Sequence, residues 1–141
     1  MRFWDSSVVV ALLVSETTSS RLLSLLEEDP AVVAWWGTPV ECVSAIARLE
    51  REGALPPLAA AEAIQRLETL RNTWDEIQPG QAIRETAERL LRVHPLRAAD
   101  SLQLAAAIVA ANYHPSMLSF VCNDERLSMA ARREGFPVFS L

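Results

Sequence analysis

The stretch Arg97–Ala111, RAADSLQLAAAIVAA, decides the architecture that we expect for this chain. Its Ala- and Leu-rich composition is typical of a buried helix, and it leads into the β-rich run SMLSFVC at 116–122. A helix that connects parallel strands runs back across the sheet, so its first residues lie near the edge where the strands end. Asp100, a carboxylate among apolar neighbours, is therefore expected at that edge.

The rest of the chain alternates short apolar runs with amphipathic segments. Strands are predicted at 1–4, 31–36, 73–78, 116–122 and 137–141. Helices are predicted at 6–16, 19–29, 38–52, 56–72, 80–94, 97–112 and 124–135. This alternation predicts an α/β fold in which helices cover both faces of a central parallel sheet. A length of 141 residues suits a single domain over 1–141.

Composition excludes several classes of function. All 13 basic residues are Arg, so the chain has neither a Walker A lysine nor a mechanism that depends on lysine. Its four Gly form no GxGxxG motif, which leaves dinucleotide binding unsupported. Cys42 and Cys122 are expected to be reduced and buried, and together with two His they do not have the spacing of a zinc site. A net charge of −5 argues against nucleic-acid binding through bulk charge.

The apolar runs are too short to cross a membrane. Val8–Val14 and Leu104–Ala111 are the longest, well below the roughly 18 residues that a span needs. Asp5 interrupts the apolar N-terminus, and no small-residue cleavage site of a signal peptide follows. We therefore expect a cytoplasmic protein that makes no use of a membrane.

Four acidic residues are predicted to converge on one edge of the sheet. Asp5 follows the first strand, Asp124 follows the fourth, and Glu41 lies in the first turn of the helix after the second strand. Together with Asp100 they belong at the carboxyl edge, where open α/β folds bind ligands. Gathered carboxylates repel one another, and a hard cation such as Mg²⁺ or Mn²⁺ is their natural partner. Metal-assisted phosphodiester hydrolysis is the chemistry that fits best.

Each of these acids also has a purely structural alternative. Asp5 and Asp124 are placed as helix N-caps, and Asp100–Gln103 and Thr38–Glu41 have the spacing of capping boxes, with Thr38 as N-cap. Taken singly, each acid is more often a cap than a ligand, whereas convergence on one edge favours a site. The remaining two Asp are interpreted as a turn residue and a solvated position in an edge strand: Asp29 and Asp75.

Aromatic and basic residues invite an RNA-binding interpretation that the pattern does not favour. Core packing accounts better than base stacking for the four tryptophans, Trp4, Trp35, Trp36 and Trp74. A solvated helix face accounts better than phosphate contacts for Arg84, Arg89, Arg92 and Arg97. His94 and His114 each precede Pro at a helix end, and catalytic roles are not expected for them.

Four segments in order, FWDSSVVVALL, TPVECVSAIARLE, LRAADSLQLAAA and VCNDERLSMAARREGFPV, resemble the acidic motifs of the PIN-domain family. The chain length and the last segment are most similar to VapC, the toxin of type II toxin–antitoxin pairs. The resemblance implies a compact α/β fold and a Mg²⁺- or Mn²⁺-dependent endoribonuclease that acts on structured RNA such as tRNA or rRNA.

By this resemblance, the catalytic and metal-binding quartet is Asp5, Glu41, Asp100 and Asp124. Ser7 matches a hydroxyl that supports the first Asp by hydrogen bonding, and Asn123 is a weaker supporting candidate. The chain departs from the family at two supporting positions: Gln103 stands where the family often has His, and Cys122 where it has a hydroxyl residue.

The family also implies a cognate VapB-type antitoxin and a toxin homodimer. The C-terminal segment of the antitoxin would lie in an apolar groove between the early helices and direct a basic residue toward the acids. Candidate groove residues are Leu12, Leu13, Leu22, Leu25 and Leu26.

Three alternatives remain open. A PIN-type RNA-processing nuclease needs no antitoxin, and a catalytically inactive PIN module would only bind. A phospho-acceptor receiver domain also gathers acids at the carboxyl edge, but it requires a lysine that this chain lacks.

Overall fold

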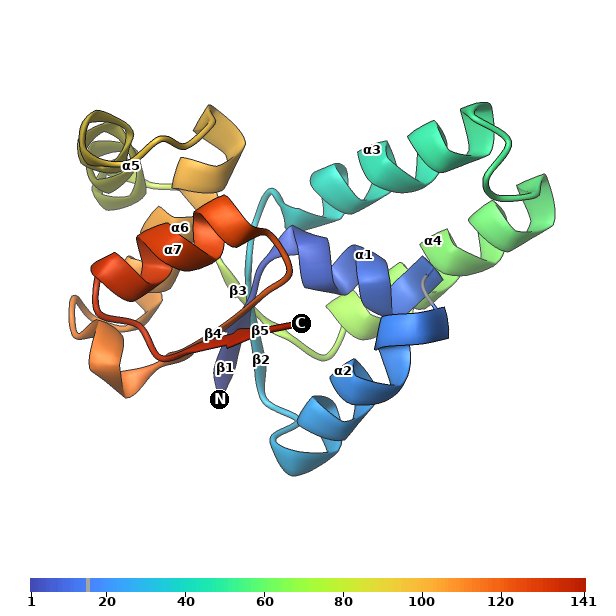
Figure 1. Ribbon diagram of the computed structural model, residues 1–141, viewed down its shortest axis with the longest axis horizontal. Helices are drawn as coiled ribbons and strands as arrows, with labels where there is room; N and C mark the ends of the chain where they lie inside the picture. The colour runs from blue at the N-terminus through green and yellow to red at the C-terminus, as the bar shows by residue number, and fades with distance from the viewer. Residues whose placement is uncertain (15) are drawn as a thin grey trace.

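Five parallel strands form the central sheet, in the order β3–β2–β1–β4–β5 (Figure 1). The computed structural model describes residues 1–14 and 16–141. The strands are β1 (Arg2–Trp4), β2 (Val32–Trp35), β3 (Asp75–Ile77), β4 (Ser119–Cys122) and β5 (Val138–Ser140). Phe3 of β1 pairs with Val33 on one side and Phe120 on the other, which places β1 at the centre. All neighbouring strands therefore end at the same edge of the sheet.

Helices cover both faces of this sheet. They are α1 (Ser6–Val14), α2 (Glu16–Glu28), α3 (Thr38–Arg51), α4 (Pro57–Arg71), α5 (Gln81–Val93), α6 (Ala98–Ala110) and α7 (Glu125–Arg133), with a 3-10 turn η1 (Pro115–Met117). The helices α1 to α4 pack on one face, and α5 to α7 pack on the other (Figure 1). The predicted α/β class, with one parallel sheet between two helical layers, is confirmed.

Successive residues of β1 belong to opposite layers, as expected for a strand that is buried on both faces. Phe3 is fully buried on the α5–α7 side, where its ring stacks on Phe120 with centroids 5.3 Å apart. Trp4 is buried on the α1–α4 side, against residues such as Val8 and Ile46. Aromatic packing on both sides thus fixes the strand whose end carries Asp5.

Most element boundaries differ from the prediction by one or two residues, and two starts differ by three. The second helix begins at Glu16 rather than at 19, and the fourth strand begins at Ser119 because η1 occupies Pro115–Met117. The predicted first helix includes residue 15, which lies outside the described residues. No single helix in the described residues is long and apolar enough to cross a membrane; α1 and α2 reach that length and composition only together, across a bend of 114°.

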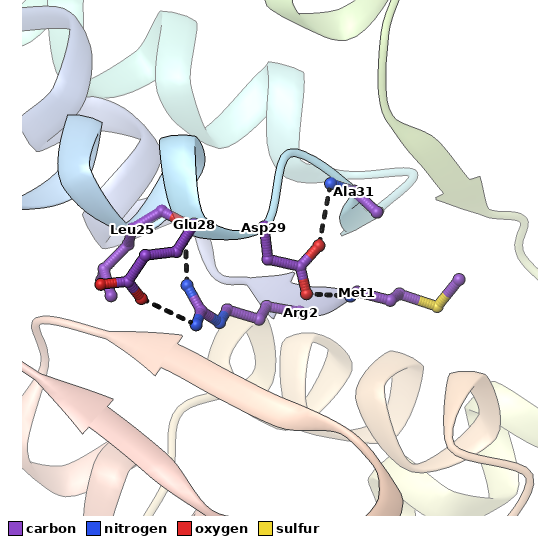
Figure 2. Close-up of polar contacts among 6 residues, drawn as sticks. All are labelled: Met1, Arg2, Leu25, Glu28, Asp29 and Ala31. Atoms are coloured by element: carbon purple, nitrogen blue, oxygen red, sulfur yellow. Dashed lines mark hydrogen bonds and ion pairs between the residues drawn. The ribbon is translucent and has the colours of Figure 1, made fainter.

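Polar contacts hold the start of β1 against the end of α2 (Figure 2). Arg2 donates to the Glu28 carboxylate at 3.1 Å, and the α-amino group of Met1 pairs with Asp29. The second carboxylate oxygen of Asp29 accepts the Ala31 N–H at 3.2 Å, so its predicted role as a turn residue is confirmed. These contacts lie at the amino edge of the sheet, away from the carboxyl edge.

A second ion-pair cluster joins the ends of α5 and α7. Glu134, next to α7, accepts from Arg89 at 2.8 Å and lies 2.7 Å from the buried His94 imidazole. Burial raises the pKa of Glu134, but the hydrogen bonds from Arg89 and His94 outweigh that effect and lower the pKa overall. This cluster fixes α7 against α5 on the same face as α6.

Candidate active site

The four predicted acids line one cleft at the carboxyl edge of the sheet. The cleft has a volume of about 590 Å³, and Asp5, Glu41, Asp100 and Asp124 all contribute to its wall. They come from the end of β1, the first turn of α3, the first turn of α6 and the start of α7. The convergence that the strand order predicts is present, whereas the roles of these residues in metal binding and catalysis stay predictions.

Asp5 is both a helix cap and a buried carboxylate. Its carbonyl accepts the Val9 N–H at 3.3 Å as α1 begins, and its carboxylate accepts the Ser7 hydroxyl at 2.8 Å. The Ser7 oxygen in turn accepts the Asn123 N–H at 3.0 Å, which ties the ends of β1 and β4 together. Burial raises the pKa of Asp5 to about 7, although the Ser7 hydrogen bonds act in the opposite direction. The N-cap interpretation is therefore correct for Asp5, but it does not explain the burial of its charge.

Glu41 is held by a side chain from another helix. The amide nitrogen of Gln103 donates to the Glu41 carboxylate at 2.5 Å and to the Thr38 hydroxyl at 3.0 Å. Thr38 and Gln103 are both buried, so this contact lies inside the protein. Burial raises the pKa of Glu41, the Gln103 bond lowers it, and the charge of Asp100 raises it further. Gln103 thus positions Glu41 through a bond between residues 62 positions apart in the chain.

The predicted Thr38–Glu41 capping box is wrong. The N-cap of α3 is Gly37, so Thr38 is already the first helical residue, and the cap makes no side-chain hydrogen bond. A Cβ at Gly37 would lie 2.6 Å from the indole nitrogen of Trp35, so the packed Trp35 ring requires glycine at the turn. The helix consequently starts one residue earlier than the Thr–Pro pair suggests.

Asp100 is not an N-cap either. Helix α6 follows Arg97 as N-cap, which places Asp100 at the third helical position, and Gln103 bonds to Glu41 rather than back to the cap. Burial and the charge of Asp124 raise the pKa of Asp100, while the backbone N–H of Arg97 lowers it. The predicted Asp100–Gln103 capping box is therefore wrong, and the Asp100 carboxylate accepts the Arg97 backbone N–H while it lines the cleft.

Asp124 caps α7 as predicted, because its carboxylate accepts the Leu127 N–H at 2.9 Å. Cys122 supports the same turn: its sulfur accepts the Asp124 N–H at 3.3 Å, and hydrogen bonding from this thiol lowers the pKa of Asp5. Burial raises the pKa of the Cys122 thiol to about 12, so the group is a neutral hydrogen-bonding side chain. The thiol thus provides the hydrogen bonding that a hydroxyl would provide at this position.

The four carboxylates act on one another, and the charges of Arg97 and Arg126 lower the pKa of Asp100. The charge of Asp124 raises the pKa of Asp5 and of Asp100, and Asp100 raises that of Glu41. Across residues 1–14 and 16–141, no Arg or His lies within ion-pair distance of any of the four. The cleft therefore holds concentrated negative charge that a cation would stabilise.

The donor chemistry of the cleft fits a hard divalent cation. The charged groups in this cleft that could coordinate a metal ion are all carboxylates, whose oxygens are the ligand type that Mg²⁺ and Mn²⁺ prefer. Within the described part of the chain, no group of three or more His, Cys, Asp or Glu side chains is disposed to hold a metal ion. Mg²⁺ commonly uses one or two carboxylates and keeps several waters, so the residues present fit that mode of binding.

Other predictions for side chains near the cleft have mixed outcomes. Trp4, Trp35 and Trp74 are buried as expected, but Trp36 is half exposed at the end of β2, so core packing is wrong for Trp36. The side chain of Asn123 is exposed, and only its backbone N–H reaches the site, through Ser7.

Two arginines of the cleft were not predicted as site residues. Arg97 lines the cleft, so a solvated helix face is an incomplete description of it, and Arg48 lines it too. Arg48 lies seven residues after Glu41, on the same face of α3, which is the sequence signal that could have identified it.

A separate apolar groove lies between α1, α2 and α4. Its volume is about 750 Å³, and its apolar lining residues are Leu12, Leu13, Leu23, Leu26 and Leu70. Three predicted groove residues are confirmed by position, while Leu22 and Leu25 are buried in the core instead. The reason is the rotation of α2, which turns those two side chains inward and exposes Leu23.

Two solved structures share this fold. A chain of a toxin–antitoxin complex from Klebsiella pneumoniae matches with a TM-score of 0.66 and 16% identity, over 99% of this chain and 96% of that chain. A chain of FitAcB from Neisseria gonorrhoeae matches with a TM-score of 0.67 and 17% identity, over 99% and 96%. No protein-family model and no curated protein sequence matches the chain. The likeness extends over the whole domain and confirms the fold that the PIN-domain resemblance implies.

Proposed function

We propose that this chain is a Mg²⁺- or Mn²⁺-dependent endoribonuclease of the PIN-domain, VapC type, and the toxin of a VapBC-type toxin–antitoxin pair. The observation that carries the proposal is the cleft: four carboxylates from four elements line it, and none forms an ion pair in the described residues. Repulsion among gathered carboxylates destabilises the folded chain unless a cation offsets their charge. Their arrangement is therefore better explained by a function than by stability.

Asp5, Glu41, Asp100 and Asp124 are the residues that would hold the cation, directly or through water. When bound, Mg²⁺ or Mn²⁺ supplies positive charge for a phosphodiester in the cleft and lowers the pKa of an attacking water. The carboxylates can also orient that water, and Asp5 can accept its proton, because burial raises the pKa of Asp5 to about 7; burial and mutual repulsion also raise the pKa values of Glu41 and Asp100.

Neutral hydrogen bonds keep these carboxylates in place without cancelling their charge. Ser7 holds Asp5, Gln103 holds Glu41, and the Cys122 sulfur holds the backbone of Asp124. A cationic residue in any of these positions would compete with the metal for the same oxygens. The supporting residues thus favour a metal site over an internal salt-bridge cluster.

The proposed partners follow from the same geometry and from the neighbour in a toxin–antitoxin complex. The apolar groove between α1, α2 and α4 would take the C-terminal segment of a VapB-type antitoxin, which would direct an Arg toward the acids. The substrate would be a structured cytoplasmic RNA such as tRNA or rRNA, and the toxin would form a homodimer.

The decisive test is RNA cleavage by the wild-type chain and by Asp100→Asn, with tRNA and rRNA as substrates and Mg²⁺ or Mn²⁺ present. Asn at the third helical position retains an oxygen for the Arg97 N–H, so the variant removes charge without removing the contact. Asp75→Asn is the matched control, because Asp75 is exposed in β3 and does not line the cleft. Circular dichroism spectra of all three proteins serve as the control for folding.

We expect the wild type and Asp75→Asn to cleave RNA, EDTA to stop both, and Asp100→Asn to lose about a hundredfold or more in rate. Cleavage by folded Asp100→Asn at the wild-type rate would remove Asp100 from the proposed site. Absence of cleavage by the wild type on both substrates, with either metal, would contradict the ribonuclease proposal.

A further inference from the structure

Two arginines line the acidic cleft with the four carboxylates, one from each helical layer. Arg48 lies on α3, two helical turns or about 10 Å along the axis from Glu41. Arg97 comes from the other helical layer, where it immediately precedes α6 and its Asp100. The acids thus lie on the helix starts, and the guanidinium groups flank them.

Neither guanidinium forms an ion pair within the described residues, although the charge of Arg97 acts on the neighbouring Asp100. Arg2, Arg66 and Arg89 of this chain form ion pairs with Glu residues at 2.8 to 3.7 Å. By contrast, within 1–14 and 16–141 no ion pair or side-chain hydrogen bond involves the guanidinium groups of Arg48 and Arg97, and both residues are exposed. They form no ion pair although carboxylates line the same cleft, and those carboxylates accept hydrogen bonds from Ser7, Gln103 and backbone N–H groups.

A polyanionic substrate needs such groups at this cleft. The chain carries a net charge of −5, and four of its carboxylates are gathered in the cleft, so an RNA strand is repelled there unless local positive charge offsets them. The chain contains no Lys, which leaves Arg as the only side chain that is cationic at neutral pH. A guanidinium binds phosphate through two parallel N–H donors, which fixes orientation as well as position.

We propose that Arg48 and Arg97 bind two phosphates of the RNA strand, one on each side of the phosphodiester that lies at the carboxylates. The inference rests on the proposed ribonuclease function and names residues that hold the substrate in register across the cleft. Arg48 holds the RNA strand against α3, and Arg97 holds it against the start of α6. The scissile phosphodiester is then presented to the acids between two fixed points.

The test measures RNA binding rather than cleavage. A fluorescein-labelled single-stranded RNA of about 15 nucleotides, long enough to cross one binding cleft, is titrated with the full chain carrying Asp100→Asn in Mg²⁺, and anisotropy is followed at several salt concentrations. Arg48→Ala and Arg97→Ala are compared in this background with Arg71→Ala and Arg84→Ala. The two controls remove the same charge from exposed positions on α4 and α5 that do not line the cleft.

We expect each cleft variant to lose about tenfold in affinity, and its slope of log K against log salt to fall by about 0.7, the contribution of one phosphate contact on a single strand. The controls should change affinity by less than about twofold, with an unchanged slope. Arg48→Lys and Arg97→Lys should restore the slope but only part of the affinity, because Lys retains the charge and loses the second donor. A folding defect would not produce that pattern.

The outcomes separate this inference from the proposed function. If the cleft variants behave like the controls, or if the RNA does not bind at all, the arginine assignment is overturned whatever the cleavage assay shows. If binding depends on Arg48 and Arg97 but the wild type never cleaves RNA in Mg²⁺ or Mn²⁺, the assignment stands and the nuclease proposal fails.

Discussion

Asp5→Asn should stabilise the protein while abolishing its activity. Asp5 is 2% exposed, and burial raises its pKa from 3.8 to about 7, so ionising it in the folded state is unfavourable. At about 1.4 kcal/mol per pH unit, this shift corresponds to about 4 kcal/mol of lost stability once the group is fully ionised. Asn has no charge, still accepts the Ser7 hydroxyl, and caps a helix about as well as Asp.

The sign of the pH dependence follows from proton counts. Between about pH 4 and pH 7 the folded chain holds a proton on Asp5 that the unfolded chain has released, so wild-type stability falls as the pH rises through this window. The gain from Asp5→Asn should therefore be about 2 kcal/mol near pH 5 and about 4 kcal/mol near pH 8. Above the pKa of Asp5 in the folded chain, the stability that Asp5→Asn adds should no longer change with pH.

The assay is urea denaturation of the wild type and Asp5→Asn in EDTA, near pH 5 and near pH 8, with Asp75→Asn as the exposed control. Added Mg²⁺ should then stabilise the wild type near pH 8 more than it stabilises Asp5→Asn, because the cation offsets the charge that the variant lacks. RNA cleavage by Asp5→Asn should be lost although the protein is more stable.

A gain that is the same at both pH values, or a loss of stability near pH 8, would refute the reasoning. The first result would mean that Asp5 ionises normally in the folded state. The second would mean that the hydrogen bonds of the carboxylate contribute more than its burial costs.

Three further substitutions probe the supporting residues and the core. Gln103→Leu should reduce RNA cleavage about tenfold to a hundredfold, with little change in the circular dichroism spectrum, because Glu41 loses its buried donor. Glu134→Gln should lower stability by about 1–2 kcal/mol near neutral pH; urea titrations should show this deficit vanish as the pH falls below 4.5, since the lowered pKa stabilises only the ionised form. Phe3→Ala should cost about 3–5 kcal/mol in urea denaturation, because the fully buried ring leaves a cavity, whereas the 81% exposed Met117 should tolerate Ala. Equal effects at Phe3 and Met117 would contradict the assigned core.

Much of the fold and of the acidic cleft is predictable from sequence, because both depend on local patterns and on chain direction. Alternating strands and helices require crossover connections, and right-handed crossovers bring the strand ends to one edge. Asp5 and Asp124 directly follow strands, and Asp100 begins a helix that returns to the next strand, so topology alone places them together. Residue spacing also identifies the N-cap roles of Asp5 and Asp124.

Side-chain partners could not be predicted in the same way. Thr38 and Gln103 have the spacing of cap residues, yet Trp35 packs over Gly37 and moves the start of α3, which leaves Thr38 inside. Leu22 and Leu23 are equally apolar in sequence, and only the rotation of α2 decides that one is buried and the other exposed.

The sequence by itself determined the order of the elements, the edge at which the acids meet, and the absence of Lys, which leaves Arg as the only basic side chain besides His. The tertiary structure alone decided that Gln103 holds Glu41 and that Arg48 and Arg97 line the same cleft. Periodicity and capping act within a few residues of chain, whereas these contacts depend on how two helical layers pack across a sheet. Hydrogen bonds between such layers exist only at distances that the packed core fixes.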